Sequence, residues 1–378
     1  MPKKQEPKEN PAPMPARRYE LDWLPIIVFA ALILYHCGMF YVSWDWHVKS
    51  SRAGDALEPL MLLTNPWRLT LLFLISGAAT RFIADKMSVG ALTASRMGRL
   101  WPPLLLAVFV IVPPQSYYEI VEALRAMGQG QSPWLDNFYL KYVTASGGWC
   151  DADGCLTTPT YNHMWFVAYL ILYTLALIPL IPMLRRAPKA LGSLISGAGF
   201  ILVPWLFLFA LRAMLFPVFG ESHDFRADWY LHVLYFSVFL FGFAIAKHEP
   251  FFERCVKWRW PALAAALICW AAILAFYRAS PDETAPPPEW LRLIARGVRE
   301  LDVWCAIVAA IGFAHRYLQN ADSPLRRYLT EAIFPYYLVH QTIIVVVGHH
   351  LDPLRLPLAI EATLLVGATL IGCALTYE

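Results

Sequence analysis

His36 is the first residue whose type and position suggest chemistry. It stands in the stretch LILYHCG at positions 32–38, after a run that is almost entirely aliphatic. A polar group in hydrocarbon costs free energy unless it has a partner or a role. A neutral imidazole can take a proton from a hydroxyl, so His36 is a candidate general base. Cys37 is adjacent, but neighbouring helix residues point about 100° apart, so packing explains Cys37 better than a catalytic dyad.

Other polar residues also fall within or beside apolar runs. These further candidates are Ser76, Arg81, Arg212, His232, His340 and Gln341. For each of them, a hydrogen bond to a neighbouring helix is the alternative to a role in a site. Ser76 precedes Gly77, and a close helix contact explains this pair better than a nucleophile does. His163 precedes Trp165 and could lie at an interface or near a substrate entrance.

Arg96 and Arg99 form a different kind of candidate. They lie three residues apart at the end of an apolar run, so on a helix they share a face and offer two cationic groups to phosphates. Ordinary anchoring at the inner membrane surface is the alternative explanation. The sequence contains no G-x-S-x-G elbow, no Walker loop and no H-E-x-x-H motif, so no nucleophile or phosphate loop competes with these residues.

Cys150 and Cys155 stand in the stretch WCDADGC. On an oxidising side of a membrane they could form a disulfide, and free thiols are the alternative. A zinc site would need a matched pair of further ligands, which the sequence does not offer nearby, so we expect no metal.

The elements that must position these residues are membrane-spanning helices. The chain is 58% hydrophobic and 16% charged with a mean hydropathy of +0.46, whereas a soluble protein carries about 25% charged residues. Apolar runs near the roughly 20 residues that cross a bilayer recur along the chain. We therefore predict an all-α polytopic membrane bundle. Its ten expected spans are 24–42, 67–84, 100–118, 161–184, 191–218, 229–247, 260–277, 301–318, 332–349 and 355–376.

The distribution of charge predicts the orientation. With an even number of spans and both termini inside, most of the 31 lysines and arginines fall in inner segments. Residues 1–18 are rich in proline and charge and are expected to be a disordered cytoplasmic tail, followed by one transmembrane domain over 19–378. The net charge of +3 then reflects topology, and without arginine–aromatic interleaving no nucleic-acid partner is expected.

Several segments resemble the membrane acyltransferase-3 family. They are RRYELDWLPIIVFAALILYHCGMFYVSWDWHVKS (17–50), LLFLISGAATRF (71–82), SRMGRLWPP (95–103), HMWFVAYL (163–170) and FPYYLVHQTIIVVVGHHL (334–351). Within that family the chain is most similar to the glucan succinyltransferase branch. The resemblance implies transfer of a succinyl or acetyl group from cytoplasmic acyl-CoA to a hydroxyl of a periplasmic or cell-envelope glycan. It also implies a bacterial inner membrane location, acyl-CoA as co-substrate with no tightly bound cofactor, and leaves a homo-oligomer open.

The family's functional positions fall on residues of this chain. Its first-helix histidine corresponds to His36, its R-x-x-R pair to Arg96 and Arg99, and its later YLxH histidine to His340, with Gln341, His163, Ser76 and Arg81 as further candidates for the lining of the site. The family also has an arginine eleven residues before the first histidine, where this chain has Pro25. His36 lies thirteen residues beyond Trp23, which is about 20 Å along a helix, so the thin pantetheine arm of CoA could present a thioester there.

Two alternatives remain open at the level of sequence. A transporter or flippase for a glycan or lipid-linked precursor would also use ten spans with buried polar residues, without consuming acyl-CoA. Within the enzyme class, an acyl-His36 or acyl-Cys37 intermediate competes with direct transfer in a ternary complex. Direct transfer is preferred because the only nearby thiol is expected to face away from the histidine.

Overall fold

The protein is built from helices. The computed structural model describes residues 18–128, 135–150, 154–186, 196–280 and 285–378, and these ranges contain no β-strand. The predicted all-α membrane bundle is confirmed. The predicted tail lies, except for Arg18, outside the described residues. The long helices are α1 (Glu20–Met39), α3 (Arg68–Ala84), α4 (Val89–Leu106), α5 (Pro113–Ala126), α7 (Trp165–Leu177), α10 (Gly199–Phe219), α11 (Trp229–Ile245), α12 (Glu249–Ala279), α13 (Glu289–Leu318), α14 (Pro324–Leu351) and α15 (Leu358–Tyr377).

Each of the ten predicted spans overlaps one helical segment, although residues 191–195 of the predicted span 191–218 lie outside the described residues. Eight segments among the described residues are long and apolar enough to cross a membrane by length and composition. The other two are α11, which is apolar but only 17 residues long, and α13, whose first half carries charged residues. Shorter helices complete the description: α2 (Glu58–Thr64), α6 (Phe138–Val143) and α8 (Ile181–Leu184).

The third predicted span is the one that differs most from the structure. The sequence predicts a short span at 100–118, whereas Val89–Ala126 is one helical segment of 38 residues. A π-helical turn over Ala107–Ile111 joins α4 to α5, and the Val112 amide donates to the Ala107 carbonyl over 2.8 Å. Proline has no backbone N–H, so it fits where a helix restarts, and Pro113 begins α5. Pro113 therefore marks a local change of helix type, and Pro102 and Pro103 lie inside α4, so none of these prolines ends the span.

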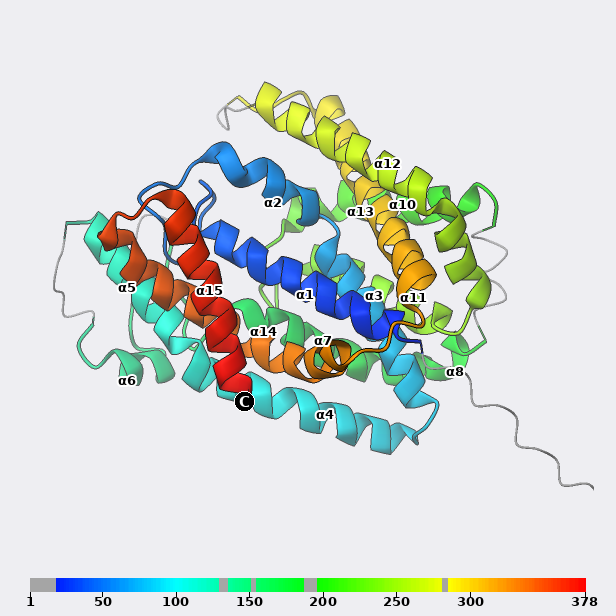
Figure 1. The fold of residues 1–378 in the computed structure, drawn as a ribbon, viewed down its shortest axis with the longest axis horizontal. Coiled ribbons are helices and arrows are strands. Elements are labelled where there is room, and N and C mark those ends of the chain that lie inside the picture. The colour runs from blue at the N-terminus through cyan, green and yellow to red at the C-terminus, as the bar shows by residue number, and fades with distance from the viewer. Residues whose placement is uncertain (1–17, 129–134, 151–153, 187–195, 281–284) are drawn as a thin grey trace, which may run out of the picture.

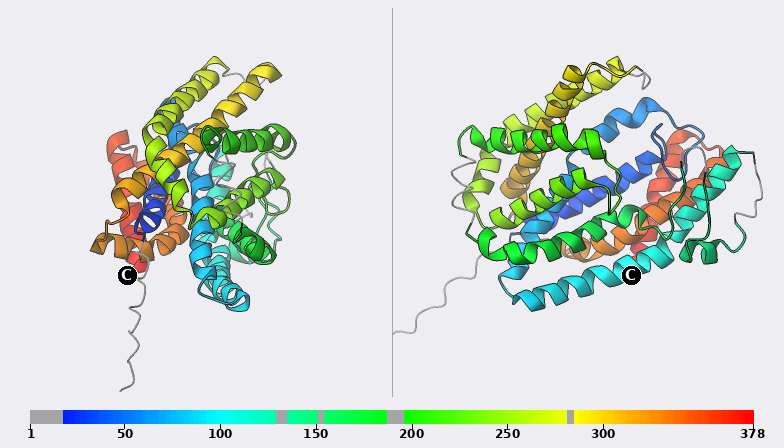
Figure 2. Two further views of the ribbon diagram at one scale, coloured as in Figure 1. Left: turned by 90° about the vertical axis from the view of Figure 1, so that its right-hand side faces the viewer. Right: turned by 180° about the vertical axis from the view of Figure 1, so that it is seen from behind.

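α1 crosses the middle of the bundle, between α3 on one side and α14 with α15 on the other (Figure 1). α12 packs along α13 at one flank, which the views from the side and from behind also show (Figure 2). α3 and α11 approach at backbone distance: a Cβ added to Gly77 would lie 2.0 Å from the Phe239 carbonyl oxygen, and one added to Gly242 would lie 2.0 Å from that of Leu74. Larger side chains at either glycine would push these helices apart.

Both described ends of the chain lie at one end of the bundle. The Tyr19 amide donates to the Gln319 carbonyl over 3.3 Å, and the Tyr377 ring lies 5.3 Å from that of Tyr328. Residues 319–323 form the turn between α13 and α14, so this turn and both chain ends share one side. The arrangement agrees with an even number of spans.

Candidate active site

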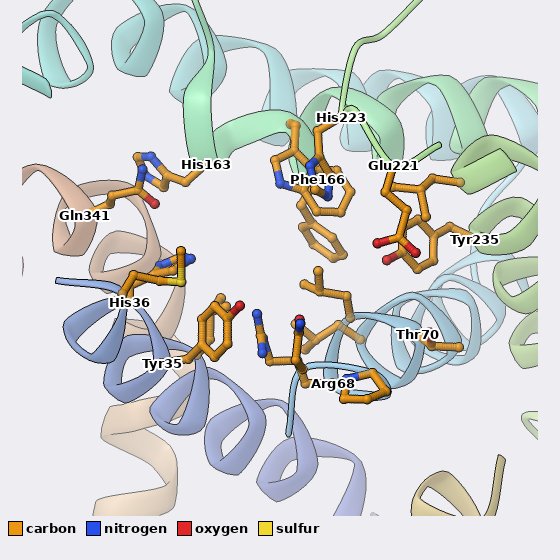
Figure 3. Close-up of a pocket in the computed structure, with 18 of the residues that line it drawn as sticks. Tyr35, His36, Arg68, Thr70, His163, Phe166, Glu221, His223, Tyr235 and Gln341 are labelled. Carbon is orange, nitrogen blue, oxygen red and sulfur yellow. The ribbon is translucent and has the colours of Figure 1, made fainter. Parts of the chain in front are cut away.

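A cavity of about 400 Å³ lies at the centre of the bundle. From α1 it is lined by Phe29, Leu32, His36 and Met39, which recur every three or four residues and so share one helix face. The start of α3, the start of α7, α11, α13 and α14 complete the wall (Figure 3). Several lining residues come from connecting segments that the charge bias predicts to be outer, namely Asp45–His47, Asn65–Pro66, Asn162 and Glu221 with His223. The cavity therefore belongs to the predicted outer half of the bundle.

His36 and His340 form a hydrogen-bonded pair at this cavity. The His36 Nδ1 and His340 Nε2 atoms are 2.8 Å apart, and the two rings are stacked with centroids separated by 5.0 Å. His340 Nδ1 lies 2.8 Å from the carbonyl oxygen of Tyr337. A carbonyl can only accept, so a neutral His340 carries its proton on Nδ1 and accepts at Nε2. His36 must then donate from Nδ1, which leaves the lone pair on its Nε2.

The Nε2 atom of His36 has no hydrogen-bond partner in the part of the chain that the structure describes, whereas His36 itself lines the cavity. His340 is fully buried behind it and does not line the cavity. The pair thus presents one basic nitrogen, His36 Nε2, to the cavity, while the hydrogen bond to His340 holds the Nδ1 of His36 in place. This is the arrangement that a general base needs, because the position of its proton is fixed before a substrate arrives.

His163 holds the segment of α14 that carries His340. Its Nε2 donates to the carbonyls of Tyr337 and Leu338, at 3.1 and 3.0 Å, and the Tyr337 hydroxyl donates back to the His163 carbonyl. Gln115, on α5, donates to His163 Nδ1 over 3.4 Å. Both ring nitrogens of His163 are therefore occupied. Its position makes it a support for the His36–His340 pair, although its side chain also borders the cavity.

A second imidazole, His47, also lines the cavity. Its Nδ1 lies 2.6 Å from a carboxylate oxygen of Glu119, and its Nε2 lies 2.9 Å from the side-chain amide nitrogen of Gln341. Gln341 also donates to the Gln115 side-chain oxygen over 3.2 Å. These contacts connect the outer segment before α2 with α5 and α14. Both ring nitrogens of His47 and of His163 are occupied, so His36 is better placed than either of them to accept a proton. The fourth histidine of the lining, His223, packs its ring against that of Trp165.

The arginines that line the cavity, Arg68 and Arg299, differ in their pairing, and Arg212 lies outside the lining. Arg299 lies 3.1 Å from Glu300, and Arg212 lies 2.8 Å from Glu221 and 3.5 Å from Glu300. Arg68 has no such carboxylate in the described ranges of the chain: its guanidinium stacks on the ring of Tyr35, with Cζ 3.4 Å from the centroid. Its Nε and Nη1 atoms are buried without a hydrogen-bond partner among the described residues.

The arginines predicted to bind phosphates lie elsewhere. Arg96 donates to the Thr80 hydroxyl over 2.9 Å, and Arg99 is exposed. Thr80 lies twelve residues beyond Arg68 on α3, which corresponds to about 18 Å along the helix axis. Neither arginine lines the cavity, and neither does Ser76. The pair therefore occupies the predicted inner end of the bundle.

Arg81, a further candidate, belongs to a cluster of charges around Asp85 at the same end. Arg81 Nε and Lys247 Nζ lie 3.0 and 2.6 Å from Asp85 Oδ2, and Arg185 Nε lies 3.2 Å from Oδ1. Burial raises the pKa of the Asp85 carboxyl, but the hydrogen bonds from Lys247 and Arg81 outweigh that effect, so its pKa lies below the ordinary value. Arg81 thus has a partner and does not line the cavity.

The remaining sequence candidates also have definite places. Arg212 is paired as described above, and His232 accepts from the Tyr173 hydroxyl at 3.1 Å and donates to the Phe225 carbonyl at 3.0 Å. Cys37 is buried in a separate hydrophobic cluster with residues of α14 and α15, and it does not line the cavity. Cys150 and Cys155 are joined by a disulfide.

No sequence pattern indicated Arg68, His47 or Glu119 directly. Arg68 is the first residue of the run RLTLLFLISG, where it resembles an ordinary charge at the boundary of a span. His47 and Glu119 lie 72 positions apart in connecting or boundary segments, so only the fold brings them together. A charged residue that directly precedes a long apolar run is a weak sign that its side chain is buried, and for Arg68 the sequence offers no stronger sign.

A family model described as an acyltransferase domain matches residues 18–378, which is nearly the whole chain. No curated protein and no solved structure matches the chain.

Proposed function

We propose that this chain, which belongs to the acyltransferase family whose model spans it, transfers an acyl group from acyl-CoA to a hydroxyl of a cell-envelope glycan. The donor arrives from the cytoplasm and the acceptor from the opposite side of a bacterial inner membrane. The transferred group is succinyl or acetyl, in keeping with the resemblance to glucan succinyltransferases. Membership of the family supports membrane acyl transfer, and the cavity supports the direct route described next.

The free Nε2 of His36 is the observation that carries this proposal. In the proposed reaction it takes the proton of the acceptor hydroxyl while the hydroxyl oxygen attacks the carbonyl carbon of the thioester. The new C–O bond forms, the C–S bond then breaks, and the CoA thiolate receives the proton from His36. The products are the acylated glycan and free CoA. Cys37 lies in a different hydrophobic cluster, so its thiol is not placed to form an acyl intermediate, and the proposed transfer is direct.

The donor would be held by Arg96 and Arg99. They lie on α4 near the predicted inner end, and Arg99 is exposed there. The separation of about 18 Å along α3 between Thr80 and Arg68 is one that a long thin pantetheine arm could span between helices. Phe29, Phe166 and Tyr337 line the cavity with aromatic side chains, and an apolar acyl arm is compatible with such a surface.

The acceptor would enter from the predicted outer end. There the cavity presents the aromatic rings of Trp46 and Trp165 together with the polar side chains of Asp45, Asn162 and His223. A sugar ring offers both apolar C–H faces and hydroxyl groups, so this mixture of flat apolar surfaces and hydrogen-bonding groups suits it. The two substrates would then meet at His36 from opposite sides.

The proposal can be tested on cells. Mass spectrometry of cell-envelope glycans is compared between cells that contain the protein, cells that lack it, and cells that contain His36→Ala at equal abundance. We expect an added acetyl or succinyl mass only with the unchanged protein. Glycans whose mass is the same in all three, but whose amount outside the membrane changes, would instead indicate a transporter.

A further inference from the structure

We propose that Arg68 is a second catalytic residue, which stabilises the negative charge on the thioester carbonyl oxygen during acyl transfer. The inference rests on the proposed function, because it concerns the charge that this reaction creates. No motif marks Arg68, and its assignment comes from its burial, its lack of a counter-ion and its place beside His36.

Arg68 is a buried cation with no opposite charge in contact among the residues that the structure describes. Its side chain lines the cavity, yet the residue is only 3% exposed, and its Nε and Nη1 atoms have no hydrogen-bond partner in the described part of the chain. A buried charge without a partner is costly, so such a residue is retained where a ligand or a reaction supplies the missing charge. Arg299, which also lines the cavity, is already neutralised by Glu300, and Arg212, which lies outside the lining, is paired with Glu221.

The position of Arg68 relative to the base fits this role. The ring of Tyr35 lies beside both groups, with its centroid 3.4 Å from Arg68 Cζ and 5.9 Å from the centroid of the His36 ring. Because both distances are measured to the same ring, Arg68 Cζ can lie no farther from the centroid of the His36 ring than their sum. In Figure 3, Tyr35 and the head of Arg68 lie on the side of the cavity next to His36. The cation and the base can therefore act on one substrate group.

The reaction creates a single negative charge between these groups. When the hydroxyl oxygen attacks, the π electrons of the carbonyl move onto its oxygen, and the tetrahedral intermediate carries this oxyanion until the C–S bond breaks and the charge leaves with the thiolate. A fixed cation in an enclosed cavity stabilises such a charge far more than water does, because it needs no reorganisation. In the ground state the carbonyl is neutral, so Arg68 favours the transition state over the bound substrate.

In a different assignment, Arg68 would bind an anion that the substrate already carries in the ground state, such as a carboxylate on the acyl group or on the acceptor. The two assignments differ in their kinetics. An oxyanion contact lowers kcat with every donor, whereas a ground-state contact raises KM and matters only for a substrate that carries the anion.

The test uses purified full-length protein, a neutral glycan acceptor, and two donors, acetyl-CoA and succinyl-CoA. For Arg68→Gln we expect kcat to fall by about 10²–10³-fold, the loss typical of one oxyanion contact. The fall should be similar for whichever donors the unchanged protein uses, with KM for donor and acceptor changed by less than about threefold. Arg68→Lys keeps the charge and should recover part of the lost kcat. The unfolding temperature of each variant shows whether the fold is retained.

Three results would overturn the assignment. Near-normal kcat in folded Arg68→Gln would remove Arg68 from the chemistry. A rise in KM without loss of kcat, or a loss confined to succinyl-CoA, would make Arg68 a receptor for a ground-state carboxylate. If the unchanged protein transferred neither group to any glycan, the proposed function itself would fail, together with the inference that rests on it.

Discussion

We expect His340 to determine which ring nitrogen of His36 carries the proton, and replacing His340 tests this dependence. In His340→Leu the Nδ1–H of His36 loses the acceptor that now lies 2.8 Å away. A buried donor without a partner costs about 1–3 kcal/mol. His36 would then favour the tautomer, or a ring position, in which Nε2 no longer offers a lone pair to the cavity. Since about 1.4 kcal/mol corresponds to tenfold in rate, kcat should fall by about 5- to 150-fold.

The assay is acyl transfer by purified protein, followed as free CoA released and as acylated acceptor formed. His340→Gln places an amide oxygen near the former Nε2 and should lose much less activity than His340→Leu. His232→Gln is the matched control, because His232, like His340, is a membrane histidine bonded at both nitrogens outside the cavity lining, but its ring nitrogens bond Tyr173 and Phe225 and not His36. Wild-type kcat in folded His340→Leu would refute the reasoning. Equal losses in the Leu and Gln variants would point to packing instead.

Three further predictions concern residues outside the cavity. Replacing Arg96 and Arg99 together by Gln should raise KM for acyl-CoA more than KM for the acceptor, because phosphate contacts are remote from the reacting atoms; unchanged donor affinity in calorimetry would favour a purely topological role. Pro25 lies three turns before His36 on the same face of α1, so Pro25→Arg should tighten acyl-CoA binding by about tenfold, or about 1.4 kcal/mol, and equal affinities would show that this position does not face the donor. Hydrogen bonds from Arg327 and Arg326 hold the pKa of Asp322 well below its ordinary value, so their stabilisation is present above the unfolded pKa of about 3.9 and is lost as the pH falls further. Asp322→Asn should therefore lower the unfolding temperature at pH 7, with a difference that shrinks below about pH 4; a difference independent of pH would exclude this ion pair as its cause.

Much of the fold follows from hydropathy alone. Side chains within a bilayer must be mostly apolar and backbone groups must bond within the helix, so each apolar run of sufficient length predicts one helix. The segment around Pro102 and Pro113 shows the limit of this rule. Proline predicts a boundary because it lacks an N–H, and Pro113 does begin α5, directly after a π-helical turn, whereas Pro102 lies inside α4 without ending it.

The candidate site could be predicted only in part. His36 was visible because an imidazole in an aliphatic run is unusual, and His340 through its resemblance to a family motif. Their contact joins residues 304 positions apart, and its tautomer depends on the carbonyl of Tyr337, which no pattern in the sequence encodes. Arg68 looked like a boundary charge because its burial, and the absence of a counter-ion among the described residues, are properties of the packed bundle. The sequence thus indicated His36 as a candidate, whereas the contacts around it depend on the fold.

The most direct test of the central claim is acyl transfer by purified His36→Ala beside the unchanged protein, with acyl-CoA binding measured on both by calorimetry. The substitution removes the base without adding a buried charge, so the variant should remain folded and bind acyl-CoA as before. A general base contributes about 10²–10⁴-fold, and we expect kcat to fall by that factor. Near-normal transfer by the folded variant would contradict the role of His36 as the general base.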